Sequence, residues 1–118
     1  MSVNSNSKRG DSVVVIGLGR FGSAVAKSLV SMGHEVLAMD ADAAAVQALS
    51  SELPHVVQAD STDLAALQQL SVNEFSHAVV SIGANLEASV LTVLNLAQIG
   101  MKDIWAKANT PQHGRIAE

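Results

Sequence analysis

The chain has 118 residues, of which 48% are hydrophobic and 15% are charged, and it contains no cysteine. This composition predicts one domain with a single core, excludes a disulfide framework and thiolate chemistry, and suits a cytosolic protein. The formal net charge of −4, with 3% aromatic residues and no basic cluster, argues against nucleic acid as a partner. No apolar run approaches the ~20 residues that a membrane-spanning helix needs.

The chain begins with polar residues and then enters a strand that leads into a glycine motif. Residues 1–11 lack the hydrophobic stretch of a signal peptide, so we expect a disordered lead-in. Residues 13–16 predict a buried strand, and residues 17–22 form a G-x-G-x-x-G sequence. Hydrophobic residues at helical spacing then predict a helix from about residue 20 to residue 32, which Gly33 ends.

The glycine motif favours a phosphate-binding turn of the dinucleotide type. Gly17 would permit the tight reversal, Gly19 would let the backbone approach a pyrophosphate, and Gly22 would let the helix pack on the strand. The backbone N–H groups and the dipole of that helix would attract the anion. The alternative is a glycine turn that only connects a strand to a helix.

An acidic residue follows the motif at the distance expected of a ribose ligand. The predicted second strand, residues 34–39, leads to Asp40, 18 residues after Gly22, and a carboxylate about 20 residues beyond the glycines accepts ribose hydroxyls in this fingerprint. Asp40 would repel a 2′-phosphate, which favours an adenosine diol over NADP. The alternative is that Asp40 or Asp42 caps the next helix and leaves the other acid for the ligand.

The rest of the chain continues the alternation of strands and helices. The periodicity and the turn residues predict a helix at 43–53 stopped by Pro54, a strand at 55–59, a turn at 60–63, a helix through Leu64 and Leu70, a strand at 78–82, a helix at 85–99, a strand at 103–107 and the start of a helix at Thr110. This pattern predicts an α/β fold, a Rossmann-like parallel sheet in the strand order 3-2-1-4-5 with helices on both faces.

Ligands of such sheets bind at the carboxyl ends of the strands, where the strand order reverses. That rule brings the glycine motif together with Asp40 and with residues 59–62, 82–85 and 107–109. The sequence therefore predicts one polar site at this edge.

Some of the polar residues at this edge have a second interpretation. Asp60, Ser61 and Asn85 are typical N-caps, a role that is compatible with nucleotide contact. Lys107 faces the predicted phosphate site, and the alternative is a solvated strand end. The four histidines show no metal-ligand spacing, and His113 alone falls on the ligand edge.

Arg20 stands at a variable position of the motif, at the mouth of the predicted phosphate turn. A guanidinium can form paired hydrogen bonds with phosphate oxygens, or reach the ligand of an adjacent subunit. A cation at a helix N-terminus opposes the helix dipole unless an anion compensates, which favours the phosphate role over a solvated arginine.

No catalytic arrangement accompanies the motif. A dehydrogenase needs an acid or base group and a substrate pocket, usually on a second domain, and 118 residues leave no room for one. The chain has no tyrosine, which excludes a Tyr-x-x-x-Lys arrangement, and it has no P-loop motif. We therefore expect binding without catalysis.

A series of short motifs runs in register through the chain: VIGLGRFGSAVAKSL with MGHEVLAMD, then QADST, VSIGAN with EAS, and IWAKA. From residue 12 to about residue 117, they resemble the N-lobe of RCK (KTN, TrkA-N) domains, which regulate potassium conductance. The pattern is most similar to the KtrA and TrkA-type cytosolic subunits of bacterial potassium uptake systems.

The resemblance implies a ligand-sensing regulator. Such domains form homodimers and octameric rings beneath a membrane-embedded potassium-translocating subunit of the KtrB/TrkH type, at the inner face of the plasma membrane. Binding of ATP, ADP or NAD(H) gates transport. The Gly-Leu-Gly-Arg-Phe-Gly form resembles the branch that ATP activates and ADP inactivates, in which the arginine matching Arg20 senses the γ-phosphate, often across the dimer.

The resemblance also assigns site residues and boundaries. Asp40 would hold ribose, and Asp60 with Ser61 would flank adenine. Residues 12–118 would be the N-lobe, truncated before the second, smaller lobe into which the family normally continues. The predicted nucleotide-binding residues are Gly17, Gly19, Arg20, Phe21, Gly22, Asp40, Ala41, Asp42, Ala59, Asp60, Ser61, Ile82, Gly83, Ala84, Asn85, Lys107, Ala108, Asn109 and His113.

Two other interpretations remain open. The chain can be an NAD-binding fragment of an oxidoreductase, in which the same glycines and Asp40 serve the cofactor and Arg20 is incidental. It can also be a structural Rossmann domain without a ligand. The sequence does not choose between ATP/ADP and NAD(H).

Overall fold

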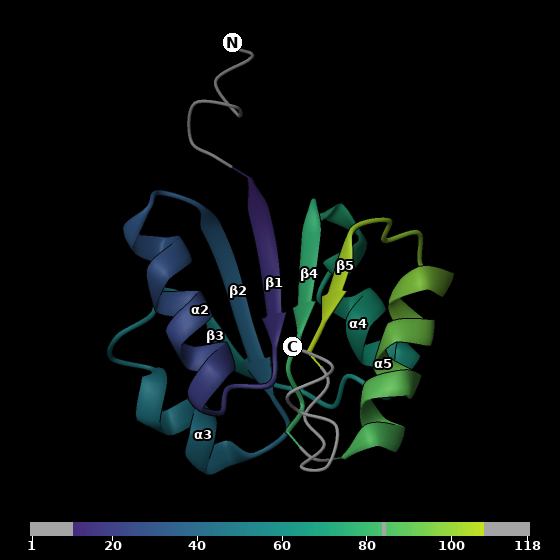
Figure 1. Cartoon of the computed structure of the whole chain (residues 1–118), viewed down its shortest axis with the longest axis horizontal. Helices are drawn as coiled ribbons and strands as arrows, with labels where there is room; N and C mark the ends of the chain where they lie inside the picture. Colours follow the sequence, from purple (N-terminus) through teal and green to yellow (C-terminus); the bar gives the residue numbers. More distant parts are fainter. Residues whose placement is uncertain (1–10, 84, 108–118) are drawn as a thin grey trace, which may run out of the picture.

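The structure is a computed structural model that describes residues 11–83 and 85–107. Strands and helices alternate along this part of the chain (Figure 1). The elements are β1 (Ser12–Ile16), α2 (Arg20–Ser31), β2 (Glu35–Asp40), α3 (Ala43–Leu49), β3 (Val56–Gln58), α4 (Leu64–Gln69), the 3-10 helix η1 (Val72–Glu74), β4 (His77–Val80), α5 (Leu86–Gln98) and β5 (Ile104–Ala106). The predicted helix from Thr110 lies outside the described residues.

The five strands form one parallel sheet in the order β3-β2-β1-β4-β5, which confirms the predicted order. Val14 in the central strand β1 is paired with Leu37 of β2 on one side and with Ala78 of β4 on the other. Because all strands run in one direction, their carboxyl ends lie at the edge toward which the arrowheads in Figure 1 point. The strand order reverses between β1 and β4, where sheets of this kind bind ligands.

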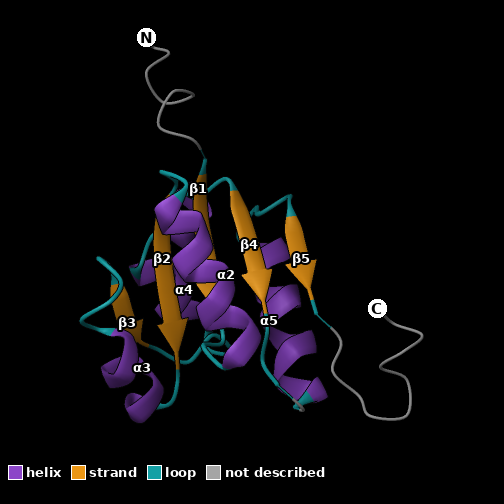
Figure 2. Ribbon diagram, turned by 60° about the vertical axis from the view of Figure 1, so that its left-hand side comes forward, coloured by secondary structure: helices purple, strands orange, loops and turns teal. Residues whose placement is uncertain are grey.

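Helices cover both faces of the sheet, and Figure 2 shows α2 on one side of it and α5 on the other. Successive residues of a strand point to opposite faces. Val13 and Val15 accordingly belong to a core cluster with Ala26 of α2. Val14 and Ile16 belong to a second cluster, which forms against α4 and α5.

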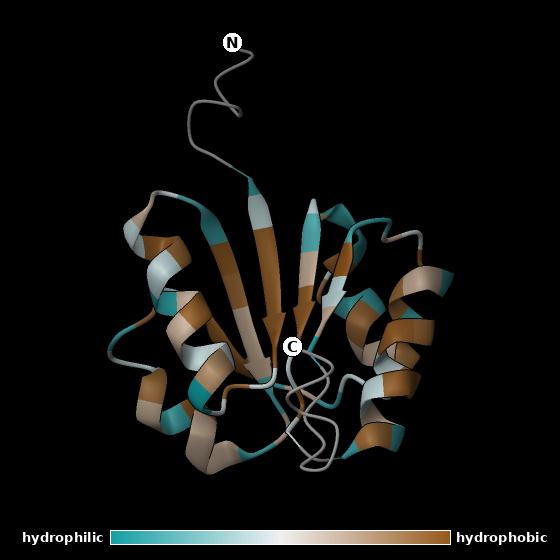
Figure 3. Ribbon diagram, in the orientation of Figure 1, coloured by the Kyte–Doolittle hydropathy of each residue, from teal (hydrophilic) through white to brown (hydrophobic). Residues whose placement is uncertain are grey.

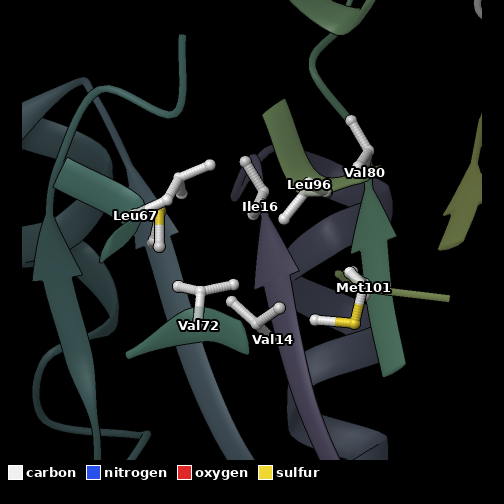
Figure 4. Close-up of a cluster of buried hydrophobic side chains, with 9 residues drawn as sticks. Val14, Ile16, Leu67, Val72, Val80, Leu96 and Met101 are labelled. Atoms are coloured by element: carbon white, nitrogen blue, oxygen red, sulfur yellow. The ribbon is translucent and has the colours of Figure 1, made fainter. Parts of the chain in front are cut away.

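The core cluster against α4 and α5 supports the carboxyl ends of β1 and β4. Figure 4 shows the side chains of Ile16, Leu67, Val80 and Leu96, all buried members of this cluster. Full burial of a side chain of this size contributes about 1.5–3 kcal/mol. Figure 3 shows the corresponding hydrophobic colour along the central strands. The packing therefore holds in place the loops that leave these two strands.

Helix α3 is shorter than the sequence predicts. It ends at Leu49, and the chain turns through residues 50–53 before it reaches Pro54. The Ser50 hydroxyl donates to the Gln47 carbonyl oxygen at 3.0 Å, and a serine that bonds locally to the backbone competes with helix formation. Leu53 is nevertheless buried, in the core cluster that contains Val13. The prediction of a helix over residues 50–53 is therefore wrong.

Several strand ends also differ from the prediction. β3 and β5, at the two edges of the sheet, have three residues each instead of five, and short edge strands are a common protection against pairing with other chains. β4 ends at Val80 and not at residue 82. The next residue, Ser81, still donates its N–H to the Ile16 carbonyl oxygen at 2.7 Å, and the chain then leaves toward α5.

Candidate functional site

Two glycines of the motif are required by the close approach of backbone segments. Gly17 has a φ of +97°, and a Cβ there would lie 2.0 Å from the Ser81 carbonyl oxygen. A Cβ on Gly22 would lie 1.8 Å from the Gly17 carbonyl oxygen. The turn is further anchored because Gly17 donates its N–H to the Met39 carbonyl oxygen at 2.8 Å. These two positions therefore accept only glycine without a backbone shift.

Gly19 differs from the other two, because the described structure offers no internal reason for a glycine there. Its φ is −74°, and no heavy atom lies within 4 Å of an added Cβ. It is the N-cap residue of α2, yet it provides no side-chain oxygen to cap the helix, a role that serine or aspartate fills well. The start of α2 is therefore open, which fits an anion held by backbone N–H groups.

Asp40 spans the junction between β2 and the glycine turn. Its Oδ2 accepts a hydrogen bond from the Leu18 N–H at 2.7 Å, and its Oδ1 accepts one from the Asp42 N–H at 2.8 Å. Asp42 caps α3 by accepting from the Ala44 N–H at 3.0 Å. The helix cap is therefore Asp42, while Asp40 braces the glycine turn and keeps further acceptor capacity for a ligand hydroxyl.

The loop after β3 carries an acidic turn. The Asp60 Oδ1 accepts from the Thr62 hydroxyl at 2.6 Å and from the Thr62 N–H at 2.9 Å. These two hydrogen bonds, the side-chain one first, hold the pKa of Asp60 below its ordinary value. Asp63, not Asp60 or Ser61, caps the next helix, through the Ala65 N–H.

Ser61 is buried and tied to α5. Its hydroxyl lies 2.7 Å from the hydroxyl of Thr92, which is fully buried. The Asn95 side-chain amide donates to the Ser61 carbonyl oxygen at 3.2 Å.

Asn85 caps α5 by accepting from the Ala88 N–H at 3.0 Å. Of the three N-cap alternatives, only the one for Asn85 is confirmed.

Two cations lie at the start of α2 and the end of β5. Arg20 is the first residue of α2 and is exposed. Lys107 follows β5, donates its backbone N–H to the Val80 carbonyl oxygen at 2.9 Å, and places its Nζ 5.4 Å from the centre of the Phe21 ring. The site thus combines positive side chains with the positive end of a helix dipole.

These loops enclose a cleft of about 1060 Å³ at the carboxyl edge of the sheet, slightly above the ~1,000 Å³ at which the usual range for small-molecule sites ends. Most of the described residues predicted from the sequence line it: Gly17, Gly19, Arg20, Phe21, Asp40, Ala41, Ala59, Asp60, Ser61, Ile82, Gly83, Asn85 and Lys107.

Some predicted residues are not part of the described lining. Gly22 packs behind Gly17 and Asp42 caps α3, so neither is among the lining residues. Ala84, Ala108, Asn109 and His113 lie outside the described residues. The predicted set of nucleotide-binding residues omits Ile16, Ser81 and Ala88, which also line the cleft. Thr62 lines it too, and it falls in the range 59–62 expected at this edge although it is not in that set. Ser81 could have been found as a polar residue near the carboxyl end of a predicted buried strand.

His77 lies at the opposite, amino-terminal edge of the sheet. Its Nδ1 is hydrogen-bonded to Asp103 and its Nε2 lies 3.0 Å from the Asp11 Oδ2. The hydrogen bond to Asp103, with a smaller contribution from Asp11, raises the pKa of His77 above its ordinary value. Among residues 11–83 and 85–107, no three histidine, aspartate or glutamate side chains are placed to hold a metal ion, and no helix is long and apolar enough to cross a membrane.

The sheet order, the glycine turn at its reversal point and the polar cleft define a Rossmann-type nucleotide-binding domain. Within that class, residues 13–118 match the TrkA-N domain. The chain belongs to the TrkA-N domain family, which confirms the resemblance found in the sequence.

Curated relatives of the chain are named as potassium uptake proteins. The chain is 43% identical over 104 residues to Ktr system potassium uptake protein A of Bacillus subtilis (strain 168), and 42% identical over 102 residues to protein C of that system and organism. It is 34% identical over 112 residues to Ktr system potassium uptake protein A of Vibrio alginolyticus. The alignments cover 88%, 86% and 94% of this chain and 47%, 46% and 51% of these relatives. The chain therefore spans about half the length of the curated relatives it matches.

Solved structures share the fold at low identity. The NAD(P)-binding domain of an exopolyphosphatase-related protein from Archaeoglobus fulgidus superposes with a TM-score of 0.75 at 21% identity, covering 91% of this chain and 80% of that one. The TrkA-N domain of the inner membrane protein ybaL from Escherichia coli gives 0.70 at 16% identity, covering 91% and 78%.

Proposed function

We propose that this chain is the nucleotide-sensing domain of a regulatory subunit of a potassium uptake system, and that it binds ATP or ADP in the cleft at Gly19. The names of the relatives support the potassium uptake part of the proposal. The open glycine turn supports the nucleotide part. The observation that carries the sensor role is Arg20, a cation in the first turn of α2, where no acidic side chain balances it.

In this proposal the nucleotide lies across the carboxyl ends of β1 and β2. The α- and β-phosphates would accept hydrogen bonds from the backbone near Gly19, where an added Cβ would meet open space and not protein. A ribose hydroxyl would donate to Asp40, whose two oxygens each already accept one backbone N–H. Arg20 would then compensate the charge of the terminal phosphate, and Lys107 would add positive charge beside the phosphates.

The proposal assigns binding and no catalysis to the chain. The rival is an NAD-binding fragment of an oxidoreductase. One solved structure of the same fold is described as an NAD(P)-binding domain, which keeps NAD(H) as the second candidate ligand. The two candidates differ at the terminal phosphate, because NAD(H) has a second nucleoside where ATP has a free γ-phosphate. The two functions therefore predict different effects of replacing Arg20 on nucleotide affinity.

Isothermal titration calorimetry with ATP, ADP, NADH and NADPH tests the proposal. We expect ATP and ADP to bind with higher affinity than NADH, and NADPH to bind worst because Asp40 repels a 2′-phosphate. Arg20→Ala should weaken ATP binding about tenfold, the loss expected for a hydrogen bond between charged groups, and should affect ADP less.

Lys27→Ala is the matched control, because Lys27 also lies on α2 but is paired with Glu52 at 2.8 Å and does not line the cleft. It should leave both affinities unchanged. Tighter binding of NADH than of ATP, with ATP and ADP affinities unchanged in Arg20→Ala, would favour the oxidoreductase fragment. If no nucleotide binds saturably, the remaining interpretation is a structural Rossmann domain without a ligand.

We further propose a cytoplasmic location at the inner face of the membrane, through contact with a potassium-translocating subunit. Residues 12–118 would be the N-terminal lobe of the regulatory subunit, and the second half of a relative's length would supply the other lobe and the contacts for an octameric ring. The coverage of about half of each relative supports this division. A test is to replace the matching half of a full-length relative by this domain. The chimera should still co-purify with that relative's translocating subunit.

A homodimer is the smallest assembly of this proposal, and α5 with β5 offers a surface for it. Leu86, Val90 and Leu94 are exposed at helical spacing along α5, and Trp105 is exposed on β5; hydrophobic colour runs along α5 in Figure 3. Glu87 is the one charged residue of α5, so the helix would present a largely uncharged face to a second copy.

Light scattering after gel filtration tests the dimer. Leu94→Gln should shift the chain toward the monomer, whereas Met32→Gln, which changes an exposed hydrophobic residue just after α2, should not. A wild-type chain that stays monomeric at every concentration would contradict the dimer of this domain.

A further inference from the structure

Phe21 is an aromatic side chain that the hydrophobic core does not explain. It stands between Arg20 and Gly22 in the glycine motif, and it is 44% exposed. It belongs to neither of the two core clusters of the described chain. The ring therefore exposes apolar surface beside the phosphate-binding turn, and burial in the core does not account for its position.

The group that the ring contacts is the ammonium of Lys107. The Lys107 Nζ lies 5.4 Å from the ring centre, within the ~6 Å over which a cation is attracted to an aromatic face. Phe21 comes from the first turn of α2, and Lys107 from the end of β5, where its backbone is bonded to β4. Both residues line the cleft, so the contact joins two separate elements at the ligand site.

We propose that Phe21 is a positioning residue, whose ring holds the Lys107 ammonium at the mouth of the cleft for the phosphates of a nucleotide. This inference rests on the proposed function. A lysine side chain loses much rotamer freedom when it binds an anion, and a ring that restricts the side chain beforehand reduces that loss.

A double-mutant cycle with ADP, measured by calorimetry, tests the positioning role. Phe21→Leu keeps an apolar side chain without the aromatic face and should weaken ADP binding about threefold, whereas Phe21→Tyr keeps the face and should retain the wild-type affinity. In a Lys107→Met background, Phe21→Leu should have no further effect on affinity. Equal losses in both backgrounds, or no loss in either, would overturn the role of Phe21. Melting temperatures of all variants show whether a loss reflects unfolding.

A second measurement needs no nucleotide. In the free protein, the ring should shift the Lys107 ε-methylene proton resonances upfield, and Phe21→Leu should abolish that shift. A wild-type protein that shows the ring shift but binds no nucleotide would refute the proposed function while leaving the contact intact. A wild-type protein that binds ADP without the ring shift would refute the positioning role alone.

Discussion

The glycines of the motif serve two different roles, the fold at Gly17 and Gly22 and the ligand at Gly19, and two alanine variants separate these roles. Gly22→Ala would place a Cβ 1.8 Å from the Gly17 carbonyl oxygen, whereas Gly19→Ala would place one in open space at a φ of −74°, which any residue adopts. We expect Gly22→Ala to destabilise the domain, and Gly19→Ala to weaken nucleotide binding at nearly unchanged stability.

The size of the Gly22→Ala effect follows from the geometry. The new Cβ and the carbonyl oxygen must separate by about 1.6 Å to reach the 3.4 Å at which ordinary contact begins. The oxygen cannot move cheaply, because Gly17 is held by the Met39 carbonyl oxygen and its own φ is +97°. Overpacking of this kind costs about 3 kcal/mol, which is a large share of a total stability of ~5–15 kcal/mol.

Thermal unfolding followed by circular dichroism measures the difference. At about 4–8 °C per kcal/mol for a domain of this size, Gly22→Ala should lower the melting temperature by more than ~10 °C. Gly19→Ala loses only part of a weak helix cap, about 0.5 kcal/mol or less, but its Cβ should weaken ADP binding at least about tenfold by blocking backbone contact with phosphate. A Gly19→Ala variant as unstable as Gly22→Ala, or a Gly22→Ala variant as stable as the wild type, would refute this assignment.

Two further variants test contacts away from the phosphate turn. The pKa of His77 is raised in the folded protein by its contacts with Asp103 and Asp11. These contacts therefore stabilise the protein below the unfolded pKa near 6.5, and this contribution is lost as the pH rises through the folded pKa. Urea titrations should show His77→Gln less stable than the wild type by under ~1 kcal/mol at pH 5.5 and no different at pH 8.5. Thr92→Val should lower the free energy of unfolding by about 1–3 kcal/mol because it leaves the buried Ser61 hydroxyl unpaired. Adding Ser61→Ala should recover most of that loss. An unchanged urea midpoint in the single variant would show that the hydroxyl pair contributes nothing to stability.

The sequence was sufficient for the features that depend on neighbours along the chain. The run of β-branched residues before Gly17 and the glycine spacing predict a strand, a turn and a helix, because each is decided by local backbone freedom and short-range periodicity. The alternation of strands and helices then predicts the order 3-2-1-4-5, since right-handed crossovers leave few other parallel arrangements. That order in turn brings the strand ends together, and most of the described site residues were predictable for that reason.

What required the tertiary structure is the pairing of side chains that are far apart in the sequence. Asp40 and Asp42 are equally good caps by residue type, and only the position of the Leu18 N–H beside Asp40, 22 residues away, assigns one to the turn and the other to α3. Ser61 has the residue type of a helix cap, yet packing of α5 buries it against Thr92. Leu53 is similar, because the core buries it although α3 ends at Leu49, and the hydrophobic spacing alone does not separate a buried helical residue from a buried turn residue.

The contact between Phe21 and Lys107 shows the same division most clearly. Each residue was predicted at the site from its own strand or motif, but their partnership over 86 positions of sequence depends on how α2 lies beside the end of β5. Local patterns determined which residues reach the carboxyl edge of the sheet, because backbone geometry there is set by short segments. The packing of helices on the sheet decided which of those residues touch, because that depends on the shape of the whole core.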